Sequence, residues 1–197
     1  MMGVQADLFG EPVATGPAAP AGFRYWPDLL SEDEQARVVR ALQALSFKPY
    51  EHLGYLGNRR IAAFGRRYDL ARQALEAAEP WPAFLQELLG QLTDRAGLPA
   101  EDFVQALVNE YQPGAGIGWH RDRPVYGRIL GVSLLSPSIM RLRQKRGAGW
   151  TRAGAPLAPG SAYLLSGEVR RDWEHSITPM TALRYSITFR TLACLTP

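Results

Sequence analysis

Apolar and polar positions follow two different periods along the chain, and the period changes near residue 103. Before that point apolar side chains recur at helical spacing, which predicts amphipathic helices over about 32–45 and 81–96. The first helix is expected to begin at a capping box formed by Ser31 and Glu34. After that point short apolar runs alternate with Gly- and Pro-containing turns, which predicts strands over about 103–111, 127–135, 139–145, 160–165 and 184–192.

Two helices followed by a run of strands is the element order of an α+β fold. We expect the helices to pack on the outer face of a β-sandwich or jelly roll. At 197 residues the chain is long enough to bury the core of one domain, which we place at residues 23–197. Residues 1–22 are rich in Ala, Gly and Pro, and we expect them to form a flexible tail.

Composition argues against several classes of protein. The single cysteine, Cys194, cannot form an internal disulfide and fits a reducing, cytoplasmic location. The sequence has no run of about eighteen apolar residues and no signal-peptide pattern, so we expect no membrane association. We also expect the protein to be a monomer.

Charge is distributed unevenly, although the formal net charge is only +3. No acidic residue occurs from Arg123 to Gly167, whereas basic residues recur throughout this region. A region of this length whose charged residues are all basic suggests a polyanionic partner such as nucleic acid. A solvated basic surface is the alternative. The basic residues are Arg123, Arg128, Arg141, Arg143, Lys145, Arg146 and Arg152.

A second candidate nucleic-acid surface lies in residues 55–68, where basic and aromatic side chains are interleaved. Such a mixture suits contact with phosphates and stacking on bases, and an ordinary amphipathic hairpin explains it equally well. Together with Arg143 and Arg146, the candidate substrate-binding residues are Tyr55, Arg59, Arg60, Phe64, Arg66 and Tyr68.

His120 and Asp122 are candidate metal ligands. In an extended strand, residues two apart point to the same side, so both can face one cavity. An imidazole and a carboxylate are two of the three protein ligands in the facial triad that binds ferrous iron and leaves positions open for substrate and oxygen. The third ligand should come from another strand, and the remaining histidines are His52 and His175. His175, which follows the strand predicted to end at Leu165, is the better candidate.

The last predicted strand carries Arg184 and Arg190 on one face, together with Ser186. Two arginines directed into a sandwich are costly without anionic partners. A small dicarboxylate beside the metal would satisfy both, because a guanidinium matches a carboxylate in a bidentate pair; pairing with protein carboxylates is the alternative. Asn109 and Tyr111 share a face of their own strand and would add neutral donors for the same ligand.

With these residues the chain resembles the AlkB family of iron- and 2-oxoglutarate-dependent dioxygenases, in element order over 23–192 and closely in motif over 103–192. The resemblance rests on an ordered set of motifs: Asn109-x-Tyr111, His120-x-Asp122, His175, and Arg184 with Arg190. It implies a double-stranded β-helix and a requirement for Fe(II), 2-oxoglutarate and O2. It also implies that the iron is held by His120, Asp122 and His175.

The same resemblance implies a placement for 2-oxoglutarate. Arg184 and Tyr111 would hold its distal carboxylate, whereas Asn109 and Arg190 would lie nearer its metal-bound end. Residues 55–68 correspond to the substrate-covering lid of the family.

The activity implied by the resemblance is oxidative demethylation of N-alkylated bases in DNA or RNA, with release of formaldehyde, succinate and CO2, as in repair of alkylation damage. One departure concerns the substrate: base-repairing members carry an acidic residue two positions after the metal-binding aspartate, where this chain has Pro124. Another group must read the base, or the substrate differs. Hydroxylation or demethylation of a tRNA base or a protein side chain is the alternative. A non-enzymatic nucleic-acid-binding module would have lost a ligand or an arginine, and none is missing.

The tail contains a further motif. Gln5, Leu8 and Phe9 are similar to the short peptide with which bacterial polymerases and repair proteins dock on the replication sliding clamp. A flexible tether would let Leu8 and Phe9 fill an apolar pocket while Gln5 forms a hydrogen bond at its edge. Docking on a clamp is therefore an expectation, and a chance apolar pair is the alternative.

Overall fold

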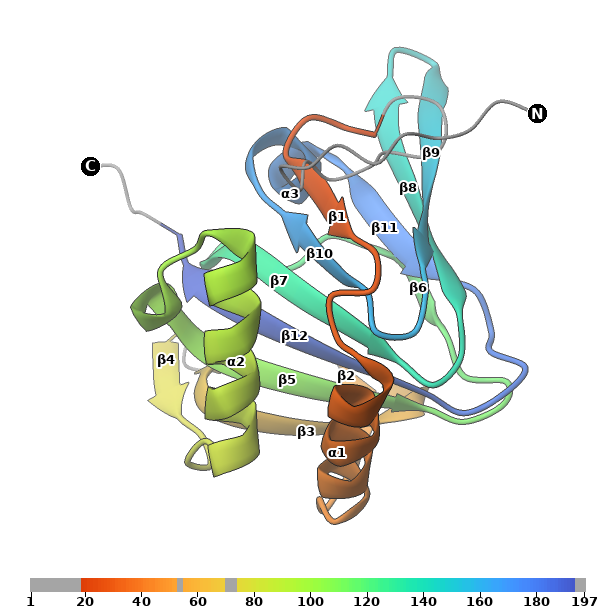
Figure 1. Cartoon of the computed structure of the whole chain (residues 1–197). Helices are drawn as coiled ribbons and strands as arrows, with labels where there is room; N and C mark the ends of the chain where they lie inside the picture. Colours follow the sequence, from red (N-terminus) through yellow and green to blue (C-terminus); the bar gives the residue numbers. More distant parts are fainter. Residues whose placement is uncertain (1–18, 53–54, 70–73, 194–197) are drawn as a thin grey trace, which may run out of the picture.

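The computed structural model describes residues 19–52, 55–69 and 74–193. Two antiparallel sheets face each other, and two helices cover the outer face of the larger sheet (Figure 1). The predicted α+β class, with a jelly-roll core and helices on the outer sheet face, is confirmed. The tail residues Gln5, Leu8 and Phe9 lie outside the described residues, so clamp docking stays a prediction.

The larger sheet has the strand order β1-β10-β7-β12-β5-β3-β2, with β4 paired to β3. Its strands are β1 (Phe23–Trp26), β2 (Lys48–His52), β3 (Tyr55–Asp69), β4 (Ala74–Ala77), β5 (Phe103–Tyr111), β7 (Tyr126–Leu134), β10 (Ala162–Leu165) and β12 (Arg184–Leu192). β12 lies centrally, hydrogen-bonded to β5 on one side and to β7 on the other.

The smaller sheet has the order β6-β11-β8-β9. Its strands are β6 (Ile117–His120), β8 (Ser138–Arg146), β9 (Gly149–Leu157) and β11 (Glu174–Ile177). The helices are α1 (Glu32–Gln43), α2 (Ala83–Ala96), the 3-10 turn η1 (Ala100–Asp102) and α3 (Gly167–Asp172). None of the helices in the described part of the chain is both long enough and apolar enough to cross a bilayer.

Helices α1 and α2 bury their apolar sides on the larger sheet. α1 begins at the predicted capping box: the N–H of Glu34 donates to Ser31 Oγ, and the N–H of Ser31 donates to Glu34 Oε2 at 2.7 Å. Tyr185, Ile187 and Phe189 of β12 belong to the core beneath the helices. Because side chains alternate along a strand, the polar residues of β12 face the other way, toward the smaller sheet.

The space between the two sheets is filled only in part. A second apolar cluster occupies it, with Ile129 from β7, Met140 and Leu142 from β8, and Tyr163 from β10. The buried polar side chains of β5 and β12 face the same interior. The functional candidates therefore lie between the sheets, and α1 and α2 support the opposite face.

The sequence does not predict the bounds of several short elements. β6 and β11, the two strands that carry His120 and His175, have four residues each and α3 has six, which is too short for a periodic pattern. β9 contains Gly154 and Pro156, residues typical of turns, but it is an edge strand paired only with β8. Proline is tolerated at an edge because its missing N–H faces no partner strand.

The segment 55–68, predicted to be a lid, coincides with β3. From Arg60 to Gly65 this strand pairs with β5 as a regular member of the larger sheet. Its central part is therefore fixed by sheet hydrogen bonds, and its role over a substrate stays a prediction.

Candidate active site

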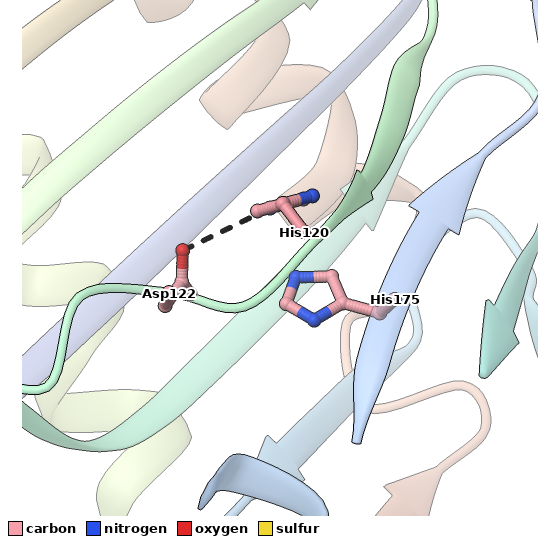
Figure 2. A group of neighbouring side chains, drawn as sticks. All are labelled: His120, Asp122 and His175. Atoms are coloured by element: carbon pink, nitrogen blue, oxygen red, sulfur yellow. Dashed lines mark ion pairs between the residues drawn. The ribbon is translucent and has the colours of Figure 1, made fainter. Parts of the chain in front are cut away.

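His120, Asp122 and His175 meet in the space between the two sheets (Figure 2). β6 ends at His120, and the neighbouring strand β11 places His175 opposite it in antiparallel register. Asp122 follows two residues after the strand rather than within it. One potential ligand atom from each residue lies within 4.8 Å of the others. Two imidazoles and one carboxylate in this arrangement suit a facial site for ferrous iron.

The ring of His120 is held in one tautomer. Its Nδ1 lies 2.9 Å from the carbonyl oxygen of Gly118, which can only accept a hydrogen bond, so Nδ1 carries the proton. The lone pair of Nε2 is then free, and this atom lies 3.9 Å from Asp122 Oδ1. The backbone thus orients the imidazole toward the shared space.

The charge states of the other two ligand candidates also fit a metal. Burial lowers the pKa of His175 to about 4, although the carboxylate of Asp122 acts in the opposite direction. Burial raises the pKa of Asp122, but the surrounding positive groups, Arg190 foremost, overcome this effect and hold it well below its usual range. At neutral pH the imidazole is neutral and the carboxylate ionised, which are the forms that bind metals.

Arg170 of α3 holds the loop that carries Asp122. Its buried guanidinium donates to the backbone carbonyl oxygens of Asp122 at 3.2 Å, of Arg123, and of Tyr126 at 2.6 Å. Nothing in the sequence distinguishes Arg170 from its exposed neighbour Arg171, so sequence reasoning missed it. We infer that Arg170 positions the carboxylate without touching the metal itself.

Replacing Arg170 with methionine is expected to lower the affinity for a divalent metal about tenfold to a hundredfold, as loss of an outer partner of metal ligands typically does. Methionine retains much of the buried volume, so the variant loses the three hydrogen bonds and the positive charge of the guanidinium near Asp122. Titration with Mn2+, followed by tryptophan fluorescence, measures the effect. Arg171→Met on the same helix is the control, and an equal loss in both variants would contradict a positioning role.

A cavity of about 340 Å³ opens beside the three ligand candidates. The pairing of β5 with β12 places Tyr111 opposite Arg184 and Asn109 opposite Ser186. These four residues and Arg190 all line the cavity. The structure therefore brings all the predicted 2-oxoglutarate-binding residues together next to the metal-ligand candidates.

Arg184 is a buried cation that lacks an anionic partner. Its side chain is among the largest that are fully buried, with 1% of the residue exposed. Nε donates to Ser133 Oγ at 3.1 Å, and the guanidinium lies 5.0 Å from the centre of the Tyr111 ring. Among the described residues, no carboxylate forms an ion pair with Arg184. Because an unpaired buried charge is costly, this position fits an anionic ligand.

Arg190 differs from Arg184, because it already has a protein partner. Its Nη1 donates to Gln105 Oε1 at 3.0 Å, and Nη2 lies 3.6 Å from Asp122 Oδ1. Its buried Nε has no hydrogen-bond partner within the described part of the chain. For Arg190 the alternative of pairing with a protein carboxylate thus holds, and Arg190 connects the cavity to the metal-ligand candidates.

Of the lid residues predicted to contact substrate, Arg59 reaches the cavity. Its Nε donates to Asn109 Oδ1 at 3.0 Å, and its guanidinium lies 3.7 Å from the centre of the Tyr50 ring. Glu51 of β2 lines the cavity nearby. Sequence reasoning missed Tyr50 and Glu51, because the two residues precede the segment 55–68 in which basic and aromatic side chains are interleaved.

Several other residues predicted to bind substrate lie away from the cavity. Arg60 points to the opposite side of β3 and pairs with Glu110 at 2.6 Å, and Phe64 is buried in the core beneath the helices. The reason is the alternation of side chains along a strand, which separates Arg59 from its neighbour. Arg66 is exposed where β3 pairs with β4, away from the cavity. Two candidates have side chains outside the described part of the structure: Tyr55 and Tyr68.

The two candidates on β8 also lie away from the cavity. Arg143 and Arg146 are on the smaller sheet, where Arg143 pairs with Glu174 at 2.6 Å and Arg146 lies 3.6 Å from Glu168. Contact of these two with a base in the cavity is therefore not supported, and any contact with substrate would be with its flanks.

Comparison with known proteins agrees with this site. The model of the 2OG-Fe(II) oxygenase superfamily matches residues 22–190. The mouse tRNA (carboxymethyluridine(34)-5-O)-methyltransferase ALKBH8 is 24% identical over 170 residues, covering 82% of this chain and 25% of that protein. The zebrafish (Danio rerio) probable RNA/DNA demethylase ALKBH6 is 29% identical over 153 residues, covering 78% of this chain and 62% of that protein.

The chain therefore spans about a quarter of ALKBH8 and less than two thirds of ALKBH6. Among solved structures, OsALKBH1 superposes with a TM-score of 0.68 at 15% identity, covering 89% of this chain and all of that one. At such low identity the superposition supports the fold.

Proposed function

The chain belongs to the 2OG-Fe(II) oxygenase superfamily, and we propose that it is an AlkB-like dioxygenase that oxidatively demethylates N-alkylated bases in DNA or RNA. Enzymes of this superfamily use Fe(II), 2-oxoglutarate and O2. When bound, these groups oxidise a C–H bond of the substrate while 2-oxoglutarate becomes succinate and carbon dioxide. An N-methyl group oxidised in this way leaves as formaldehyde and restores the base.

In this proposal His120, Asp122 and His175 would hold the iron, and a backbone carbonyl and Arg170 keep His120 and Asp122 in place. Arg184 would pair with the distal carboxylate of 2-oxoglutarate beside the Tyr111 ring, in a bidentate contact that no carboxylate of the described residues already makes. Asn109, Ser186 and Arg190, which line the same cavity, would contact the rest of 2-oxoglutarate. Apolar side chains of the cavity exclude water from the reacting centre: Ile129, Met140, Leu157 and Leu165.

The observation that supports a nucleic-acid substrate is the groove that leads to the metal-ligand candidates. This groove has a volume of about 980 Å³ and includes His120 and Asp122. Its rim combines cationic and aromatic side chains: Arg59, Arg121, Arg123, Arg141, Tyr50 and Trp119. Cations can contact phosphates and aromatic rings can stack on a base that has left its stack to reach the iron.

Glu51 and Arg59 are the groups we propose to read the base. Pro124 cannot supply the acidic contact that the resemblance to the AlkB family implies for this position. Glu51 lines the cavity and has no ion-pair partner among the described residues. Its carboxylate can accept hydrogen bonds from the polar edge of a base, and Arg59 can donate them.

Formaldehyde release from methylated oligonucleotides tests the proposal. The protein is incubated with Fe(II), 2-oxoglutarate and single-stranded DNA or RNA that carries N-methylated bases, and formaldehyde and succinate are measured. Formaldehyde in proportion to repaired base is expected, with the unmethylated oligonucleotide as control. Succinate formation without formaldehyde from either nucleic acid would contradict the proposal and leave the dioxygenase class intact.

A tRNA base is the second candidate substrate. It is favoured by the similarity to ALKBH8, a protein named for tRNA modification, although this chain spans only a quarter of it. Unfractionated tRNA is added as a third substrate to the same assay. Nucleoside analysis that reveals an oxidised base, without release of formaldehyde, would favour hydroxylation of a tRNA base over demethylation.

A further inference from the structure

The outward face of the smaller sheet carries a row of stacked cations and tryptophans, which we call the cationic ladder. The guanidinium of Arg143 lies between two indoles, 4.3 Å from the centre of the Trp119 ring and 4.2 Å from that of Trp150. Arg141 lies 5.1 Å from the Trp119 ring and Lys145 lies 5.2 Å from the Trp150 ring. The order along the face is therefore Arg141, Trp119, Arg143, Trp150 and Lys145.

The charges of the cationic ladder are only partly neutralised. Glu174 pairs with the central Arg143, which makes that residue a structural support. Arg141 and Lys145, at the two ends, are exposed, and in the described part of the chain neither forms an ion pair with a carboxylate. Arg152 of β9, opposite Arg143 in the register, is likewise exposed and unpaired within this part. The face thus presents three cations to solvent.

The tryptophan rings limit the freedom of these long side chains. A cation against an indole face is attracted by the ring quadrupole, and an arginine held between two rings cannot turn away. The ladder therefore keeps its charges in an extended row before any partner arrives, which lowers the entropy lost on binding. Along β8 the two end cations, Arg141 and Lys145, are separated by four residues, or roughly 13 Å at the rise of a strand.

The cationic ladder continues the groove that leads to the iron site. Trp119 and Arg141 belong both to the ladder and to the wall of that groove, together with His120 and Asp122. At the other end, the hairpin of β8 and β9 projects beyond the rest of the molecule (Figure 1). A linear polyanion that places one of its repeating units beside His120 and Asp122 could thus extend along the cationic ladder toward the β8–β9 hairpin.

We propose that the cationic ladder binds the sugar–phosphate backbone of the single strand that flanks the nucleotide being oxidised. This inference rests on the proposed function, since it extends the path of the same substrate. Phosphates lie against Arg141 and Lys145 of the ladder and against Arg152 beside it, and the adjacent nucleotide enters the groove. A single strand fits better than a duplex because its backbone can turn from the open sheet face into the cavity.

The double substitution Lys145→Gln with Arg152→Gln tests the proposal away from the active site. Binding of an unmodified, labelled strand of roughly 15 nucleotides is measured by fluorescence anisotropy across about 50–200 mM salt. The log–log salt slope is expected to fall by about 1.4, roughly 0.7 for each lost phosphate contact. DNA and RNA strands should show the same change, because the contact is to the backbone.

The matched control is Arg37→Gln with Arg40→Gln, which removes two exposed positive charges from α1, at the other end of the molecule (Figure 1). Its salt slope is expected to stay within error of the wild type. Melting temperatures verify that both variants are folded, and if the double variant melts early, Lys145→Gln alone should show about half the change in slope.

Three outcomes would overturn the proposal: no binding by the wild type, an unchanged slope in the ladder variant, or an equal change in the control. Because the strands are unmodified, the result does not depend on demethylation. Binding by the ladder without turnover of methylated substrates would instead count against the proposed function alone.

Discussion

Alanine at His120, Asp122 or His175 is expected to abolish turnover, measured as succinate and as formaldehyde. Each substitution removes one of three convergent ligand atoms that lie within 4.8 Å of one another. A divalent metal then keeps two protein ligands, and its affinity falls together with the geometry that leaves positions open for substrates. Retained decarboxylation of 2-oxoglutarate in any variant would remove that residue from the ligand set.

Two of these variants, His120→Ala and Asp122→Ala, should differ in the stability of the metal-free protein. His120→Ala is expected to leave the melting temperature nearly unchanged, because that residue is partly exposed at the end of a strand. Asp122→Ala is expected to lower it, since the buried Arg190 loses the carboxylate at 3.6 Å. Asp122→Asn, which keeps the volume and removes the charge, is the matched control that separates electrostatics from packing.

Arg184→Ala is expected to raise the requirement for 2-oxoglutarate by at least about a hundredfold. Losing one partner of a buried, hydrogen-bonded ion pair costs about 3–5 kcal/mol, and each 1.4 kcal/mol is about a factor of ten in affinity. The measurements are the KM for 2-oxoglutarate and the rise in melting temperature that 2-oxoglutarate produces. In the wild type this rise should be large, and in the variant it should vanish.

A lysine at the same position provides the control. Arg184→Lys retains the charge but not the fork that matches a carboxylate, so an intermediate KM is expected. The ligand-free Arg184→Ala protein should not be strongly destabilised, because the charge that it loses has no carboxylate partner among the described residues. An unchanged dependence on 2-oxoglutarate would contradict the placement of its distal carboxylate.

The sequence predicts those parts of the site that follow from the alternation of side chains along a strand. Along β12 the alternation separates Arg184 from Tyr185, and the structure places them on opposite faces, one lining the cavity and the other in the helix-side core. The same rule pairs Asn109 with Tyr111. The strand period thus predicts which side chains face the cavity, and a buried arginine among them draws notice because an unpaired buried charge is costly.

The parts that the sequence did not predict depend on register and on long-range contacts. Arg59 and Arg60 look equivalent in sequence, yet the pairing of β3 with β5 turns one toward Asn109 and the other toward Glu110. Arg170 stands in a helix of six residues, and its partners are backbone carbonyls 44 to 48 positions away. Backbone acceptors leave no signature in residue type, so no sequence pattern reports such a contact.

The central place of β12 in the larger sheet bears on the order in which the molecule folds. β5 and β7 are hydrogen-bonded to β12 and not to each other, so they have no common partner until the last strand inserts. β1 likewise cannot join the sheet before β10 has formed, since Trp26 pairs with Ala162. These paired strands are far apart in the sequence, so bringing them together closes long loops of chain and costs entropy before the contacts are gained. Folding is therefore expected to be slow compared with a helical protein of similar size. During synthesis on the ribosome the iron site therefore forms late, after almost all the described chain has emerged.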